Sequence, residues 1–332
     1  MRKSTYHAPK ITVIGGGTGL PILLSGLKEA HCDLTAVVTV ADDGGSSGKL
    51  RTSLNTIPPG DIRNCLVALS NVDNIYKEVF QYRFDSKDKE FSGHAIGNLV
   101  IAALTEMRGD VYSALKLISG ALKVNGRVLP ACEDPLILQA YYADGSCVEG
   151  ETTIVADKRP IKRVDVRVAT EAISQRTEVK AGRGVVQAIQ SADIVVLGPG
   201  SLYTSILPNL VIPEIRQALQ TTPAKVAYVC NIMTQLGETE HFSDADHLRV
   251  INEHLGGKYI DVALINSLTV PYDYIEHNEV LDYLVQVKHD RQGLKESSAQ
   301  IIAEDFLDLR KNGIYHDQNK LVAAIMRIYR HL

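Results

Sequence analysis

The sequence predicts an α/β fold: a Rossmann-like, three-layer domain with a mostly parallel β-sheet and a small antiparallel β insertion. Short apolar runs rich in β-branched residues alternate with helical patterns along most of the chain, which is typical of a parallel sheet covered by helices. Each run is followed by glycine or polar residues, at the strand ends where open α/β sheets bind ligands. Only residues 131–182 break this alternation.

The first unit reads as strand, glycine turn and helix. Residues 10–14 form a short apolar run that enters GGGTGLP, and Thr18 is placed to cap the helix that follows. The helix is indicated by apolar residues at the spacing of one helical face. These residues are Leu20, Leu23, Leu24 and Leu27.

Further strands and helices follow in the same rhythm. The apolar runs at 34–40, 192–197, 225–230 and 262–265 predict strands, and residues 62–69 and 95–107 predict helices. A closing helix is expected near the C-terminus from Leu321, Ala324, Ile325 and Ile328, which share one helical face.

The antiparallel insertion is predicted from a hairpin signal. Asp144-Gly145 lies between the β-prone arms of residues 136–154, and residues 161–168 alternate as a half-exposed strand does. We therefore expect residues 1–130 and 183–332 to form one nucleotide-binding domain, interrupted by an insertion at 131–182.

Composition excludes several classes of protein. The 332 residues carry a net charge of −4, so no basic field for nucleic acid is evident. No apolar run approaches the roughly 20 residues of a membrane span. The five cysteines are far apart and form no CxxC, which argues against a disulfide framework and predicts a cytoplasmic protein. We also expect a homo-oligomer.

The glycine turn is the first candidate binding element. Glycine permits positive φ and close approach of a ligand, and the N–H groups at a helix start favour an anion. The dinucleotide pattern G-x-G-x-x-G is imperfect here, because Leu20 replaces its third glycine. The candidate ligand residues are Gly15, Gly16, Gly17, Thr18 and Gly19.

The second predicted strand ends in ADDGGSSGK, residues 41–49. An acid near Asp42 commonly accepts from ribose hydroxyls, which leaves Asp43 without an assigned role. Asp43 is a candidate for a second hydroxyl contact, for a divalent metal ligand, or for a hydrogen bond that holds the turn. Gly44, Gly45 and Ser46 can present donors to a ligand.

Four later loops add candidate ligand residues. They read PPGDIRN, GHAIGNL, GPGSLYTS and CNIMTQLGET, and two of them follow predicted strands. Asp61 is a possible helix N-cap, and Ser201 fits an N-cap or a ligand contact equally well, although the GPGS turn as a whole favours binding. His94 is a candidate acid, base or phosphate contact, although a structural histidine is the commoner case. The candidates are Arg63, Asn64, His94, Asn98, Gly198, Pro199, Gly200, Ser201, Tyr203, Asn231, Thr234, Gln235 and Thr239.

The same motifs, in this order, resemble the YvcK-type gluconeogenesis factors of the wider CofD-like family, which includes 2-phospho-L-lactate transferase. The resemblance runs from about residue 10 to at least residue 320. It implies a Rossmann-like fold, with phosphates at residues 15–19 and 198–201 and sugar or metal near Asp42 and Asp43. The C-terminal IYHDQNK, residues 314–320, matches the family's motif only loosely, so no ligand contact is assigned there.

Three functions remain open at this point. The resemblance favours a regulatory protein that binds a UDP-sugar or NAD and is needed for cell shape on gluconeogenic carbon sources. A CofD-like transferase that uses a nucleotide diphosphate donor and magnesium is the alternative, with Asp43 and His94 as catalytic candidates. An NAD-dependent oxidoreductase is disfavoured by the missing third glycine. The sequence contains no HExxH motif.

Overall fold

A seven-stranded sheet forms the centre of the computed structural model, which describes residues 7–85, 92–169, 178–272, 274, 285–311 and 313–332. The strand order is β10-β9-β8-β7-β1-β2-β3, and each neighbouring pair is parallel. The predicted α/β class is confirmed. The strands are β1 (Lys10–Gly15), β2 (Asp33–Val38), β3 (Arg127–Pro130), β7 (Ile194–Leu197), β8 (Lys225–Val229), β9 (Val262–Asn266) and β10 (Gln300–Glu304).

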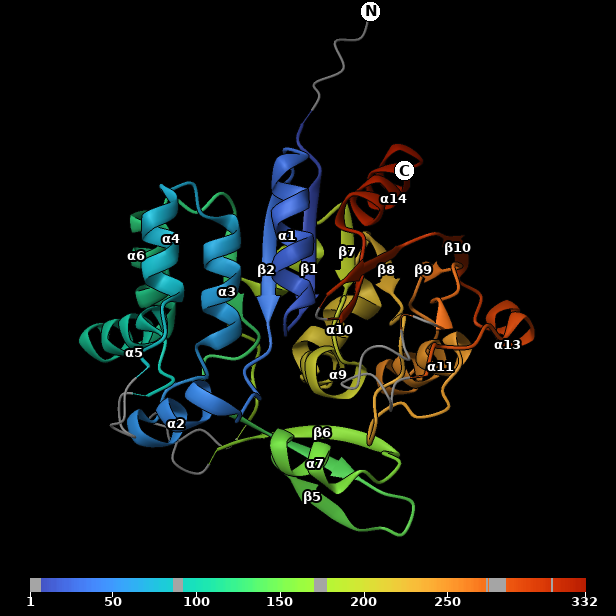
Figure 1. Ribbon diagram of the computed structural model, residues 1–332, viewed down its shortest axis with the longest axis horizontal. Helices are drawn as coiled ribbons and strands as arrows, with labels where there is room; N and C mark the ends of the chain where they lie inside the picture. Colours follow the sequence, from blue (N-terminus) through green and yellow to red (C-terminus); the bar gives the residue numbers. More distant parts are fainter. Residues whose placement is uncertain (1–6, 86–91, 170–177, 273, 275–284, 312) are drawn as a thin grey trace, which may run out of the picture.

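The direction of winding reverses between β1 and β7. From β1 the chain proceeds to β2 and β3, whereas from β7 it proceeds the other way to β8, β9 and β10. Because parallel crossovers are right-handed, the two halves place their helices on opposite faces. Helix α1 (Gly19–Glu29) packs beside α3 (Gly60–Leu69) in Figure 1, and it also contacts α14 (Gln318–Arg330). In the other half, α10 (Pro213–Thr221) packs beside α8 (Val185–Gln190). Such a reversal creates a crevice at the carboxyl ends of the two strands.

The other helices surround this sheet. They are α2 (Gly45–Leu54), α3 (Gly60–Leu69), α4 (Asn74–Gln81), α5 (Ile96–Arg108), α6 (Val111–Ala121), α8 (Val185–Gln190), α9 (Leu207–Leu210), α11 (Asp244–Leu255), α13 (Arg291–Glu296), α14 (Gln318–Arg330) and the π-helix η1 (Leu202–Ile206).

Apolar side chains on both faces of the sheet fix the first unit. Ile11, Val13 and Ile14 of β1 are buried, as expected for a strand covered by helices on both sides. The four leucines predicted for one face of α1 are also buried, each contributing about 1.5–3 kcal/mol. The predicted cap by Thr18 is wrong: Thr18 has helical φ and ψ, and its side chain makes no capping hydrogen bond.

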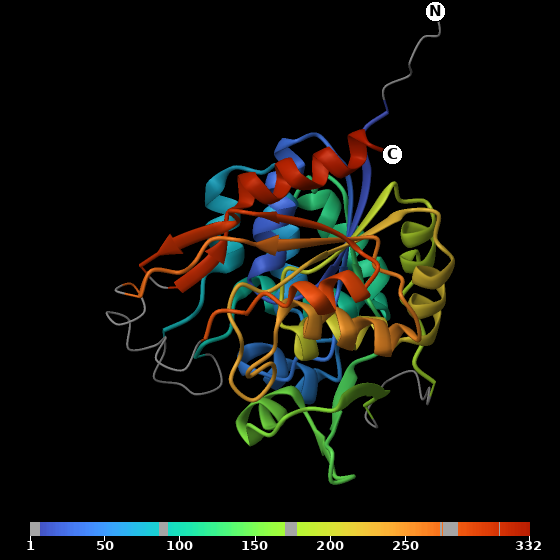
Figure 2. The same cartoon turned by 90° about the vertical axis from the view of Figure 1, so that its right-hand side faces the viewer.

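A second, antiparallel sheet lies within residues 131–182. Strands β4 (Leu136–Tyr141), β5 (Cys147–Glu149) and β6 (Arg163–Val168) pair in the order β5-β4-β6. The predicted hairpin turn is present, with Asp144 Oδ1 accepting from Ser146 N at 2.9 Å. The expected β arm is shorter than predicted, because Gly150 turns the chain into helix α7 (Glu151–Asp157). Figures 1 and 2 place this sheet beyond the carboxyl edge of the main sheet.

The C-terminal region adds a hairpin and the predicted closing helix. Strands β11 (Leu307–Arg310) and β12 (Gly313–His316) pair antiparallel, and α14 buries its four predicted apolar residues. All five cysteines are free thiols. Among the residues described, no helix is both long and apolar enough to cross a membrane. The division into one domain and an insertion stays a prediction.

Candidate functional site

The loops after β1, β2 and β7 meet at the point where the winding reverses. Gly198 N donates to Ile14 O at 2.9 Å, and Thr39 N donates to Gly15 O at 2.9 Å. A Cβ atom on Gly19 would lie 3.1 Å from Pro199 Cγ, so the two glycine loops are in direct contact. The sequence placed these loops on one edge of the sheet, and the structure agrees.

The glycine turn is closed by an aspartate. Gly17 has φ +71°, and its N–H donates to Asp61 Oδ2 at 2.6 Å. Asp61 is therefore not the N-cap that the sequence suggested: α3 begins at Gly60, and the carboxylate reaches across to the turn instead. A Cβ on Gly16 would lie 2.8 Å from the same oxygen, which explains the need for glycine there. Burial raises the pKa of Asp61.

A cavity of about 250 Å³ opens between these loops and the C-terminal hairpin. The sequence predicted seven of its lining residues: Thr18, Gly19, Pro199, Gly200, Ser201, Asn231 and Gln235. It missed the others, which are Ile22, Leu23, Ile232, Met233, Ile314, Tyr315, His316, Gln318 and Leu321. No aspartate, glutamate, lysine or arginine is among these described lining residues, so the wall of the cavity carries no formal charge once His316 is neutral.

Internal hydrogen bonds fix the polar groups of the wall. Gln235 Nε2 donates to Ser201 Oγ at 2.7 Å, and Asn231 Nδ2 donates to Gly200 O at 3.1 Å. His316 Nε2 lies 3.0 Å from Cys230 O, and burial lowers the pKa of His316 to about 4. The ring is therefore neutral at pH 7, with Nε2–H as donor and Nδ1 as acceptor.

Three predicted residues lie behind the cavity wall. Tyr203 Oη donates to Ile161 O at 3.2 Å, and Thr234 Oγ1 donates to Val285 O at 2.9 Å. Thr239 Oγ1 accepts from Gln235 N at 2.9 Å. In this structure their hydroxyl groups hold the loops at residues 198–209 and 230–239 in place.

Acidic side chains gather after β2. Asp42 Oδ1 accepts from Gly44 N at 2.8 Å, and Asp43 Oδ1 accepts from Thr152 N at 2.9 Å, which ties α7 to the turn. Glu151 also lies here, although no sequence pattern points to it. Its burial, and next the charge of Asp42, raise the pKa of its carboxyl. No three His, Cys, Asp or Glu side chains in the described residues are placed to hold a metal ion.

The remaining candidates form a separate network on α2, α3 and α5. Arg63 donates to Asn98 Oδ1 at 2.7 Å and to Asn64 Oδ1 at 2.8 Å. Asn98 Nδ2 donates to Ser46 Oγ at 3.0 Å, and Ser46 Oγ lies 2.9 Å from His94 Nδ1. None of these five residues lines the uncharged cavity. Gly44 and Gly45 lie at the start of α2.

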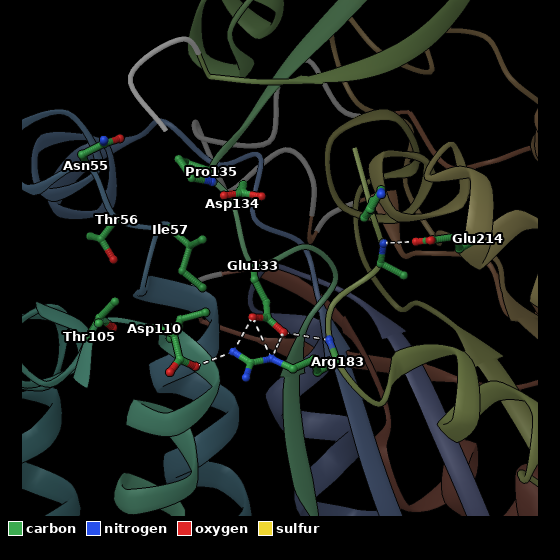
Figure 3. A pocket seen from close by; sticks show the side chains of 14 residues that line it. Asn55, Thr56, Ile57, Thr105, Asp110, Glu133, Asp134, Pro135, Arg183 and Glu214 are labelled. Atoms are coloured by element: carbon green, nitrogen blue, oxygen red, sulfur yellow. Dashed lines mark hydrogen bonds and ion pairs between the residues drawn. The ribbon is translucent and has the colours of Figure 1, made fainter. Parts of the chain in front are cut away.

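Figure 3 shows a larger cavity of about 550 Å³ elsewhere on the molecule. Its lining carries four acidic and two basic side chains, and Arg183 is already paired: Arg183 Nε donates to Glu133 Oε1 at 2.7 Å, and the same guanidinium also binds Asp110. None of the predicted ligand residues lines this cavity. The candidate site is therefore the smaller cavity at the winding reversal.

Named relatives cover nearly the whole chain. A protein of Listeria monocytogenes named "Gluconeogenesis factor" is 44% identical over 326 residues, which is 98% of this chain and 97% of the relative. A Lactococcus lactis protein, provisionally named a gluconeogenesis factor, is 49% identical over 96% of this chain and 97% of its own length.

A solved structure and a family model complete the comparison. The crystal structure of a Bacillus halodurans protein matches with a TM-score of 0.90 and 39% identity, over 96% of this chain and all of that chain. The family model described as 2-phospho-L-lactate transferase CofD matches residues 11–307. The chain therefore belongs to the CofD family.

Proposed function

We propose that this protein is a gluconeogenesis factor that binds a nucleotide-type ligand, either a UDP-sugar or a dinucleotide such as NAD. In this proposal it acts in the cytoplasm as a regulatory protein needed for cell shape and wall synthesis on gluconeogenic carbon sources. The names of its relatives support the role, and the position of the cavity supports the binding.

The uncharged wall of the cavity is the observation that carries the proposal. A nucleobase and a ribose are uncharged and combine flat apolar faces with hydrogen-bonding edges. Leu23 and Met233 offer apolar contact, while the His316 Nδ1 acceptor and the Asn231 amide offer polar contact. Small-molecule sites commonly combine apolar walls with a few polar groups in this way. The phosphates then extend out of the cavity toward the glycine turn.

Calorimetric titration with UDP-N-acetylglucosamine and with NAD tests the proposal. Thr18 is exposed at the cavity, and its side chain makes no capping bond, so Thr18→Trp fills the cavity without removing such a contact. We expect at least a tenfold loss of affinity in this variant. Lys116→Trp, at an exposed position of α6 where the side chain makes no hydrogen bond to a described residue, is the control. Failure of the wild-type protein to bind any nucleoside diphosphate would refute the proposal.

A CofD-like transferase is the alternative function. The family match and the acidic residues near Asp42 favour it, with Asp42 and Asp43 as the candidate magnesium ligands. Such an enzyme would break the bond between the two phosphates of its donor, pass the phospho-acyl group to an acceptor and release a nucleoside monophosphate. Incubation with diphosphate donors and candidate acceptors in magnesium, followed by chromatography, separates the two functions. Under the regulatory proposal no monophosphate is released.

A further inference from the structure

Arg63 is a buried cation whose described hydrogen-bond partners are neutral. It is 3% exposed, and its guanidinium donates to the amide oxygens of Asn98 and Asn64. Its Nε atom is buried without a partner. The nearby carboxylate of Asp61 binds the N–H of Gly17 instead. Buried arginines are normally paired with an acid, so this arrangement leaves positive potential available to an anion.

A chain of hydrogen bonds leads outward from Arg63. The guanidinium donates to Asn98, and Asn98 donates to Ser46. When Ser46 in turn donates to His94 Nδ1, the His94 Nε2–H becomes the outer donor of the chain. Among the described residues, none makes a hydrogen bond to that nitrogen. Hydrogen bonds in such a chain polarise one another, so the buried charge strengthens the last donor.

The start of helix α2 adds donors at the same place. Its N-cap residue is Gly44, which has no side chain to satisfy the first N–H groups of this ten-residue helix. The positive end of the helix dipole therefore lies beside Ser46. Lys49 is exposed, and its charge helps burial to lower the pKa of His94. The Asp42 carboxylate near this helix start is already bonded to Gly44 N.

We propose that Ser46, His94 and the first turn of α2 form an anion subsite, charged by the buried Arg63. It holds a phosphate or carboxylate group of the ligand, apart from the uncharged cavity that takes the base. This inference rests on the proposed function, because it assigns a second acidic group to the same ligand. A nucleotide that carries an acidic group at the end away from its base would occupy both the uncharged cavity and the anion subsite.

Asn98→Asp gives a sharp test because it changes charge without changing shape. The new carboxylate would pair with Arg63 and cancel the potential that the subsite uses. Inorganic phosphate and malonate serve as the probes in calorimetric titrations at pH 7.5 and low ionic strength. We expect the wild-type protein to bind at least one probe, and Asn98→Asp to bind it at least tenfold more weakly with no loss of thermal stability. Asn74→Asp, exposed on α4, is the control with the same change of charge.

The outcomes separate this inference from the proposed function. Affinity for phosphate and malonate that is unchanged in Asn98→Asp, or absent from the wild-type protein, would overturn the subsite. If Asn98→Asp unfolds, Ser46→Ala breaks the same chain and should weaken probe binding at least threefold. Titration with uridine and adenosine, which carry no phosphate, reports on the cavity alone. Wild-type protein that binds phosphate but no nucleoside or nucleotide would contradict the proposed function and leave the subsite standing.

Discussion

Glu238 makes the stability of the protein depend on pH. It is 5% exposed, accepts hydrogen bonds from Tyr203 N and the Thr204 hydroxyl, and has one oxygen without a partner. Burial raises the pKa of its carboxyl from 4.5 to about 7. The ionised form is therefore disfavoured in the folded protein relative to the unfolded chain.

The sign and size of the effect follow from linkage. A raised folded-state pKa contributes stability that is fully present below pH 4.5 and is lost as the pH rises through about 7. With about 1.4 kcal/mol per pKa unit, this group lowers the free energy of unfolding by about 2.5 kcal/mol between pH 5 and pH 8. Glu238→Gln removes that component, because its side chain does not ionise.

Urea denaturation of both proteins at pH 5, 6, 7 and 8 measures the difference. Between pH 5 and pH 8, we expect the free energy of unfolding of the wild-type protein to fall by about 2.5 kcal/mol more than that of Glu238→Gln. Other ionisable groups titrate equally in both proteins and cancel in the comparison. Two pH profiles that run parallel within about 0.5 kcal/mol would show that the Glu238 carboxyl is not desolvated, and the reasoning would fail.

Two further predictions concern the loops. Gly17→Val should weaken nucleotide binding at least tenfold in calorimetry, because φ +71° strains a β-branched residue at the turn; Gly120→Val, which has open space around it, is the control. Asp43→Asn should change nucleotide affinity equally in magnesium and in EDTA, since Asp43 Oδ1 holds Thr152 N. A larger loss in magnesium would favour the transferase.

The sequence predicted the part of the site that is built from local patterns. A glycine turn between an apolar run and the leucines of α1 identifies strand, turn and helix without knowledge of the rest of the chain. The carboxyl ends of parallel strands share one edge, so the loops at residues 15–19 and 198–201 were expected to meet. Both expectations depend only on residues close in sequence and on a general rule of topology.

The errors arise where partners distant in sequence decide the outcome. Residues 151–154 look β-prone, but Thr152 N receives a cap from Asp43, so the segment starts a helix. Asp61 stands at a typical N-cap position, but the turn at Gly17 takes its carboxylate. The motif at residues 314–320 is visible in the sequence, but no sequence pattern shows that His316 contacts Cys230. Only the fold brings these two residues together.

The part of the candidate cavity that the C-terminal hairpin lines has a consequence for biosynthesis. Thr18 and Gly19 leave the ribosome early, whereas the hairpin that supplies Tyr315 and His316 follows nearly three hundred residues later. A nascent chain thus lacks a complete cavity during most of its translation. Under the proposed function, ligand binding is then a late event, and we expect proteolytic cleavage within this hairpin to abolish binding while leaving the parallel sheet intact.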